Sequence, residues 1–424
     1  MRKKIFSILC LTFLLAPLFL QTSVVAASSD DWSMFRGDLS HTGYSSTAPA
    51  TSNNLLWKLD TGTPVGSSAA VVDGKVYVAS NDGSIYCLNA ADGSQIWKSI
   101  LSHRSAISSA IAVANGYLYF GCYDKNVYCL DASTGKDVWS YATGDSVQSS
   151  PSVVNGHVYV GSWDGNVYCL DAASGNKIWN YTTGALVDSS PAVADGKVYV
   201  GSADHNVYCL DAETGDKVWS FATGNTIQSS PAVVDGYVYI GSHDNNVYCL
   251  NATTGEKVWT YQEQGIVDSS PAVANGFVYV GSGVLNSNTT DKNVYCLNAA
   301  TGEKVWSYET YDGIYSSPAV VGDYVYVGGW DDNIYCLNAS SGLSLWTYTT
   351  QGHISASPAV SEGIVYITSW DHNVYALGTK STKASSTGTP TWLIGAAAVI
   401  AIAAIAAVLL VVIRRKPKVK KAKR

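Results

Sequence analysis

The sequence predicts an all-β fold, an eight-bladed β-propeller of four-stranded antiparallel blades closed by an N-terminal strand, plus one C-terminal transmembrane helix. Three observations predict the propeller. Tryptophan recurs at a step of about 40 residues, each repeat holds four short strand-like runs, and the incomplete repeats at the two ends complement each other. A fixed period of this length is typical of repeat proteins, whose units bury their cores by stacking. The recurring residues are Trp57, Trp97, Trp139, Trp179, Trp219, Trp259, Trp306 and Trp346.

One repeat, residues 145–184, shows how the four strands are predicted. Runs rich in β-branched and aromatic residues are separated by the turn pairs Asn155-Gly156 and Asp164-Gly165 and by a third turn that ends at Gly175. Asn-Gly and Asp-Gly are the strongest short hairpin signals. The repeat is therefore expected to be an antiparallel meander, with strands A to D at 149–154, 158–162, 166–171 and 177–181.

The two faces of strand C indicate how the meanders pack. Val167 and Cys169 point to one side, and Tyr168 and Leu170 to the other. A sheet exposed on one face would alternate apolar with polar residues, so both faces of this sheet must be covered. Sheets covered on both sides that repeat every 40 residues or so fit blades around an axis.

The chain ends indicate closure of the ring. Residues 354–377 hold strands A to C of an eighth unit without a strand D, and residues 55–62 are a strand D without strands A to C. We expect the N-terminal strand to complete the last blade, which hides two edges that would otherwise invite aggregation. An open array with frayed ends is the alternative.

A spaced motif gives a family resemblance. Ala132-Ser133-Thr134-Gly135 precedes Trp139 in the pattern A-x-[TS]-G-x-x-x-W, which recurs before Trp179, Trp219, Trp259, Trp306 and Trp346. The pattern resembles the Trp-docking motif of the pyrroloquinoline-quinone (PQQ)-like, BamB-like β-propeller repeat, and residues 32–43 resemble the segment that precedes such propellers. The resemblance implies that each Trp packs between blades against the Gly-containing turn. It does not imply one activity, because the family includes quinoprotein dehydrogenases and non-catalytic BamB-like scaffolds.

The terminal segments predict export and anchoring. We divide the chain into a signal peptide (1–26), a lead-in segment (27–54), the propeller (55–378), a Ser/Thr-rich linker (379–390), a transmembrane helix (391–413) and a basic tail (414–424). A lipoprotein signal at Cys10 is the less favoured alternative. The positive-inside rule puts the tail in the cytoplasm and the propeller outside, on a single-pass cell-membrane protein.

Charge disfavours a nucleic-acid partner. Of 26 Lys and Arg residues, 11 lie in the two terminal segments, whereas all 33 acids lie between them, so the exported part carries 15 − 33 = −18. Nucleic-acid-binding domains are typically basic.

Cysteines and sequons give two more expectations. Seven cysteines share one place in strand C, and because facing sheets lie about 10 Å apart they are expected to remain buried thiols. Cys122 lies diagonal to Cys129, and we favour a free thiol there over a strained disulfide. Glycosylation signals occur at Asn180, Asn251, Asn288 and Asn338.

Two sets of variable positions are the candidate binding residues. The residue before the Ser pair of strand A, expected at one mouth of the central channel, is Gly66, Ile107, Gln148, Asp188, Gln228, Asp268, Tyr315 or Ser355. The variable residue of the B–C turn is Asn81, Tyr123, Trp163, Ala203, His243, Trp330 or Trp370, and Trp163, His243, Trp330 and Trp370 are a candidate aromatic patch. A hydrated channel lining and ordinary hairpin packing are the alternatives.

We therefore expect a non-enzymatic binding or scaffold protein for a protein or glycan partner, with no cofactor, no metal and no catalytic residues. The alternatives are a PQQ-dependent dehydrogenase and a BamB-like envelope assembly factor. The dehydrogenases of the resembled family use a metal-bound quinone, a carboxylate base and an adjacent Cys-Cys pair, and this chain has no such pair.

Overall fold

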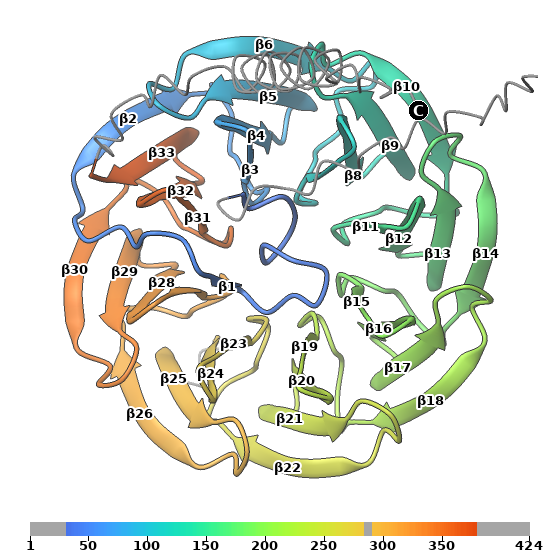
Figure 1. The fold of residues 1–424 in the computed structure, drawn as a ribbon, viewed down its shortest axis with the longest axis vertical. Coiled ribbons are helices and arrows are strands. Elements are labelled where there is room, and N and C mark those ends of the chain that lie inside the picture. Colours follow the sequence, from blue (N-terminus) through green and yellow to red (C-terminus); the bar gives the residue numbers. More distant parts are fainter. Residues whose placement is uncertain (1–30, 284–290, 380–424) are drawn as a thin grey trace, which may run out of the picture. The chain divides into compact units, whose positions relative to one another are not determined.

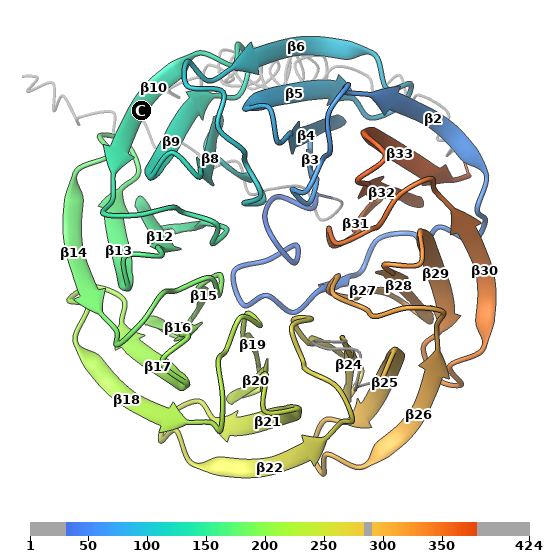
Figure 2. The same ribbon diagram turned by 180° about the vertical axis from the view of Figure 1, so that it is seen from behind.

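The computed structural model describes residues 31–283 and 291–379, which form eight sheets arranged as blades around one axis (Figure 1). Within each blade, strand A is nearest the axis and strand D is outermost. Figure 2 shows the same ring from behind. Blades 1 to 4 are β3 (Ala70–Val72), β4 (Lys75–Ala79), β5 (Ser84–Asn89) and β6 (Gln95–Ile100); β7 (Ala112–Ala114), β8 (Tyr117–Gly121), β9 (Asn126–Asp131) and β10 (Asp137–Ala142); β11 (Ser152–Val154), β12 (His157–Gly161), β13 (Asn166–Asp171) and β14 (Lys177–Thr182); and β15 (Ala192–Ala194), β16 (Lys197–Gly201), β17 (Asn206–Asp211) and β18 (Lys217–Ala222).

Blades 5 to 8 follow the same plan. They are β19 (Ala232–Val234), β20 (Tyr237–Gly241), β21 (Asn246–Asn251) and β22 (Lys257–Gln262); β23 (Ala272–Ala274), β24 (Phe277–Gly281), β25 (Asn293–Asn298) and β26 (Lys304–Glu309); β27 (Ala319–Val321), β28 (Tyr324–Gly328), β29 (Asn333–Asn338) and β30 (Ser344–Thr349), extended on the inner side by β1 (Tyr44–Ser45); and β31 (Ala359–Ser361), β32 (Ile364–Thr368), β33 (Asn373–Gly378) and β2 (Leu55–Asp60).

The hairpin turns explain why these segments form meanders. In blade 3, Asn155 and Gly156 have φ of 51° and 78°, which is the backbone that a two-residue turn needs to match the twist of the strands it joins. In strand C of this blade, β13, the four central residues are buried, as expected for a sheet covered on both faces. The outermost strand, β14, is largely exposed.

The N-terminal strand closes the ring. β2 pairs antiparallel with β33, with Trp57 opposite Ala376 and Asp60 opposite Asn373. The prediction of a closed eight-bladed ring is therefore confirmed, and the open array is excluded for the described residues.

Seven of the eight repeated Trp residues lie on the C–D turn of the next blade. Trp57 covers Gly93, where an added Cβ would lie 2.6 Å from the indole, and its Nε1 donates to Ala90 O at 2.8 Å. Gly is required there because φ is +72° and the ring leaves no room for a side chain. Tyr366 donates to the same carbonyl at 3.3 Å.

The eighth docking place belongs to the lead-in segment. Blade 8 has no covalent C–D turn, and Ala50 O accepts from Trp346 Nε1 at 3.2 Å and from Tyr326 OH at 3.1 Å. Residues 50–57 repeat the docking spacing, with Asn53 where the other turns have Gly. We did not identify this copy in the sequence, although the position of Ala50 seven residues before Trp57 is a readable signal.

A second ring of contacts links the inner strands. The backbone N–H of the second Ser in one blade donates to the hydroxyl of the second Ser in the next, as in Ser150 to Ser190 at 2.9 Å. In blade 2 this place is taken by Ala110, whose N–H donates to Ser150 Oγ at 3.0 Å but which offers no hydroxyl to blade 1. The ring of hydrogen bonds is thus interrupted between blades 1 and 2.

The eight cysteines of the described residues are free and buried, in agreement with the prediction of thiols. Cys122 Sγ lies 3.4 Å from Ala106 O. Within residues 31–283 and 291–379 no helix has the length and apolar character needed to cross a membrane. The predicted signal peptide, transmembrane helix and basic tail, with nearly all of the linker, lie outside the described residues.

Candidate functional site

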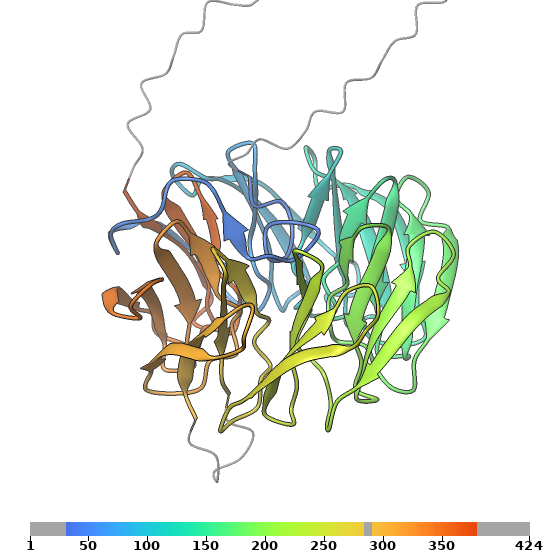
Figure 3. The same cartoon turned by 60° about the horizontal axis from the view of Figure 1, so that its bottom comes forward.

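The lead-in segment covers one end of the channel, the end that bears the A–B turns (Figure 3). Its backbone joins the innermost strands of several blades, as in Trp32 with Val71 in blade 1 and Thr42 O with Val273 N–H in blade 6, both at 2.8 Å. β1 then pairs in parallel with β27, with Tyr44 opposite Val320. The segment therefore works as a plug that is bonded around the channel.

Arg36 fixes the plug in the channel. Its side chain is 1% exposed, and its two terminal nitrogens donate to Pro318 O and Pro271 O at 2.6 Å each. Burial lowers the pKa of Arg36 to about 9, although Asp38 nearby raises it. His41 is also buried, and its Nε2 lies 3.2 Å from Ser152 Oγ. The sequence resemblance marked this segment but gave no sign that it fills the axis.

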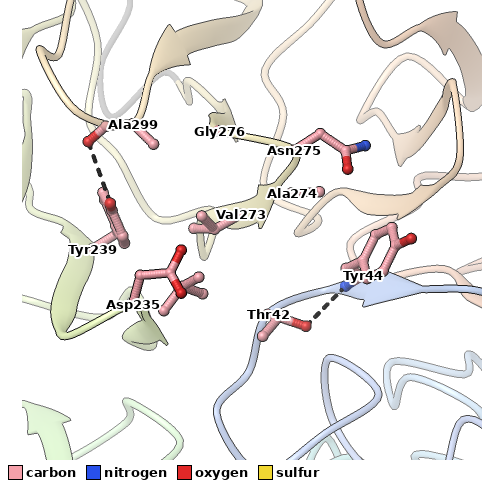
Figure 4. Close-up of a pocket in the computed structure, with 10 residues that line it drawn as sticks. Thr42, Tyr44, Asp235, Tyr239, Val273, Ala274, Asn275, Gly276 and Ala299 are labelled. Carbon is pink, nitrogen blue, oxygen red and sulfur yellow. Dashed lines mark hydrogen bonds between the residues drawn. The ribbon is translucent and has the colours of Figure 1, made fainter.

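Two hollows adjoin the plug. One of about 250 Å³ lies between the A–B turns of blades 5 and 6, where Thr42 and Tyr44 face Asp235 and Asn275 (Figure 4). The other, of about 580 Å³, is an open depression lined by the lead-in segment itself, from Asp31 to Thr42. Neither contains any of the candidate binding residues that we predicted.

The opposite end of the channel carries both predicted sets. Strand A runs from the mouth residue toward the A–B turn, so the mouth residues lie at the end that bears the B–C turns. One assignment is corrected. The structure aligns Ser108 with Gln148, and Ile107 with the buried Val147. This alignment follows from equivalent hydrogen bonds, because Gly121 N–H donates to Ser109 Oγ as Gly161 N–H donates to Ser149 Oγ. The prediction was one residue off because the Ser pair of blade 2, Ser108-Ser109, begins one residue before the place of the Ser pair in blade 3, and Ala110 takes the place of the second Ser.

The two sets are partners of each other. Trp163 in the B–C turn of blade 3 donates through Nε1 to Asp188 in blade 4, and His243 in blade 5 pairs with Asp268 in blade 6. Gln228 Nε2 is 3.5 Å from Asp188 Oδ2. Burial raises the pKa of Asp188, the indole hydrogen bond lowers it, and the charge of Asp268 raises it again. Polar contacts at the mouth thus link neighbouring blades, from blade 3 to blade 5 and from blade 5 to blade 6.

An aromatic stack lies beside the mouth. Tyr315 and Trp330 have ring centroids 4.4 Å apart, and Trp330 stacks on His353 at 5.4 Å with an interplanar angle of 17°. His353 Nδ1 is also 3.1 Å from Asp332 Oδ1. Trp330 remains 38% exposed and Trp370 48% exposed, although Trp370 Nε1 donates to Ser355 Oγ at 2.9 Å.

Trp163 stands apart from this stack but is not isolated. Its ring meets Tyr123 edge to face at 6.1 Å, across blades 2 and 3. Burial raises the pKa of Tyr123, while hydrogen bonds with Ser108 and Gln148 lower it. The sequence did not predict His353 as a member of the aromatic group, because its place in the D–A connection is variable in every repeat.

This end of the ring is strongly acidic. The B–C turns and D–A connections together contain 14 Asp or Glu residues and three Lys or Arg residues. Many of the acids have structural roles. Asp164, for example, accepts Gly144 N at 2.6 Å and Tyr168 OH at 2.7 Å. The summed charge nevertheless attracts cationic groups toward the mouth.

The predicted glycosylation positions differ in their surroundings. Asn180 lies on the outermost strand of blade 3, where its Nδ2 donates to Asn166 Oδ1 at 2.9 Å. Asn251 and Asn338 use Oδ1 to hold the backbone of their C–D turns, through Thr253 N and Ser341 N. Asn288 lies outside the described residues. Glycosylation at these positions stays a prediction.

A metal-bound quinone would need a set of metal ligands and a paired-cysteine contact. In residues 31–283 and 291–379, no group of three or more His, Cys, Asp or Glu side chains is placed to hold a metal ion. The strand-C cysteines lie in separate blades, and Arg36 in the channel already donates to two carbonyls. These residues do not fit the metal, carboxylate and paired-cysteine set that the family resemblance implies for the dehydrogenases.

Comparison with known proteins places the chain among such propellers. The sequence matches the family described as "Outer membrane protein assembly factor BamB" over residues 46–108, 99–186, 164–309 and 290–392. No curated protein sequence matches the chain.

Similar solved structures include BamB from Moraxella catarrhalis, with 24% identity and a TM-score of 0.66 over 77% of this chain and 98% of that one. A europium-containing methanol dehydrogenase has 15% identity and a TM-score of 0.71 over 83% and 98%, and the computationally designed Ika8 protein 18% and 0.68 over 77% and 99%. At these identities the likeness establishes the fold alone.

Proposed function

We propose, from the premise that this chain belongs to the family of the outer membrane protein assembly factor BamB, that it is a non-enzymatic binding protein whose acidic, aromatic channel mouth takes up a partner. We further propose that it is exported and anchored through residues 391–413, so that the propeller lies outside the cell membrane.

The convergence of the two candidate sets at one end supports this proposal most directly. Exposed Trp330 and Trp370 lie in B–C turns, at the same end of the channel as the mouth residues Asp188 and Asp268. Aromatic residues are enriched where proteins bind each other, and complementary charge speeds and orients encounter. A protein with a basic surface therefore suits this end best, and a glycan stacked on the indoles is the second choice.

The fold does not decide between this role and catalysis. A BamB, a methanol dehydrogenase and a designed protein share it with this chain. A PQQ-dependent dehydrogenase remains the competing proposal, and an envelope assembly factor is a special case of the binding role.

One experiment separates the classes by placing a photo-crosslinking amino acid at position 370 in the full-length protein on intact cells. We expect a discrete crosslinked product that is lost when Trp330 is replaced by Ala. Position 343 is the matched control, because Leu343 is 69% exposed in the C–D turn of blade 7 at the other end of the ring.

Equal products from positions 370 and 343 would argue against a binding surface at the mouth. In parallel, the purified protein is mixed with PQQ and calcium, and dye-linked alcohol oxidation is followed. Turnover in that assay would replace the binding proposal with the dehydrogenase.

A further inference from the structure

One blade departs from the repeat at a buried carboxyl group. In six D–A connections the residue after strand D is a Thr whose hydroxyl bonds to two backbone carbonyls, as Thr223 does with His205 O at 3.0 Å and Asn225 O at 2.8 Å. The six are Thr61, Thr143, Thr183, Thr223, Thr310 and Thr350. The connection between β22 and β23 has Glu263 instead. A hydrogen-bond donor is thus exchanged for an acidic group.

Glu263 is buried without a well-formed hydrogen bond. Its side chain is 3% exposed, and neither carboxyl oxygen makes a hydrogen bond of normal geometry. Ser282, 0% exposed, faces it and also has no partner for its hydroxyl. In blade 3 the equivalent Ser162 hydroxyl bonds to Asp145 O at 3.2 Å. The presence of Glu263 therefore leaves two buried polar groups, its own carboxyl and the Ser282 hydroxyl, without the hydrogen bonds that the equivalent Thr and Ser hydroxyls make in other blades.

Further oxygen atoms converge at the same place. A Cβ added to Gly265 would lie 2.4 Å from Gly283 O, 2.7 Å from Ser282 Oγ and 3.1 Å from Asp291 Cβ. Asp291, 2% exposed, accepts hydrogen bonds from Gln264 N, Tyr295 OH and Asn293 Nδ2 at 2.9, 2.9 and 2.6 Å. A carboxylate has about four lone-pair sites, and donors among the described residues occupy three of those on Asp291.

The electrostatics require a compensating charge or proton. Burial raises the pKa of Glu263 well above its ordinary value, and the charge of Asp291 raises it further, while Ser282 lowers it. Lys292, next to Asp291 in the sequence, pairs instead with Glu309, whose Oε1 lies 3.5 Å from Lys292 Nζ. An isolated buried carboxylate is costly unless it is paired or coordinates a metal.

We propose that Glu263, Asp291, Ser282 and the Gly283 carbonyl form a binding site for one calcium ion between blades 5 and 6. All the ligand atoms are oxygens, which calcium and magnesium prefer, whereas softer metals prefer sulfur or nitrogen ligands. Calcium accepts irregular geometry and a mixture of carboxylate, hydroxyl, carbonyl and water ligands, whereas magnesium demands a near-ideal octahedron. The proposal is independent of what binds at the channel mouth.

The test uses the purified full-length protein, freed of metal and titrated with terbium and with calcium. Tyr261 and Tyr295 both interact electrostatically with Glu263, so bound terbium should show sensitised luminescence. Calcium should displace terbium and raise the unfolding temperature, with magnesium weaker than calcium. Glu263→Gln and Glu263→Thr should abolish both effects.

Two controls keep the outcome clear. Glu309→Gln removes an exposed carboxylate in the same blade as Asp291 and should leave terbium binding unchanged. Glu263→Thr restores the residue of the six other connections, so it should fold even where the Gln variant does not. Terbium emission or a calcium shift that persists in Glu263→Thr would overturn the proposal. So would a wild-type protein that responds to neither ion, which would indicate that a proton on Glu263 satisfies the pocket.

Discussion

Replacing Ala110 by Ser is expected to complete the ring of hydrogen bonds around the channel. Seven links of this ring are present, with N···O distances of 2.8 to 3.1 Å. The missing link would join Ser68 N to a hydroxyl at position 110, where the other blades have Ser. Because seven blades already hold Ser on the same backbone, the new hydroxyl should fit without strain.

The magnitude follows from one buried hydrogen bond. A typical intramolecular hydrogen bond contributes about 0.5–1.5 kcal/mol to the free energy of unfolding, and ordering a Ser side chain costs little of that. In a ring of this size the change corresponds to a rise of roughly 1–3 °C in the unfolding temperature. The reverse change, Ser150→Ala, leaves Ala110 N–H buried without an acceptor and should cost about 1–3 kcal/mol.

Thermal unfolding followed by circular dichroism tests both variants. A stabilised Ala110→Ser protein and a destabilised Ser150→Ala protein are expected. The reasoning is refuted if Ala110→Ser unfolds at or below the wild-type temperature while Ser150→Ala is neutral, because the inter-blade bonds would then carry no free energy.

Three further predictions concern the closing strand, the plug and the thiols. Trp57→Ala leaves a cavity between blades 8 and 1, where the closing strand packs on Gly93, and should lower the free energy of unfolding in urea denaturation by about 3–5 kcal/mol. A loss under about 1 kcal/mol would contradict this. Arg36→Lys keeps a cation but cannot serve both proline carbonyls, so thermal unfolding should show a loss of about 1–3 kcal/mol, and an unchanged midpoint would speak against the plug. Burial raises the pKa of the Cys87 thiol from 9.0 to about 11. The free energy of unfolding should therefore fall as the pH rises above 9.0, where the thiol ionises in the unfolded chain but not in the folded protein. Alkylation of the native protein at pH 8, about one unit below the ordinary thiol pKa, should leave the described cysteines unmodified, and rapid labelling would disprove their burial.

Much of the fold could be predicted because its signals are local and repeated. The Asn155-Gly156 turn, the apolar faces of strand C and the spacing that ends in Trp139 each depend on a few neighbouring residues, and repetition made them unambiguous. The closing role of Leu55–Asp60 followed from the missing strand of the last blade. The candidate site was only half predicted, since the variable positions were identified but their pairing was not.

The sequence by itself determined the number of blades, the closing strand and the burial of the cysteines, because short-range periodicity encodes them. Only the tertiary structure decided that the lead-in segment plugs one mouth through Arg36, that Trp163 meets Asp188, and that Glu263 lies beside Ser282. Those contacts join residues from different blades or from segments as far apart as 282 positions. No local pattern can specify such pairs, because the packing of neighbouring blades and the path of the lead-in segment bring them together.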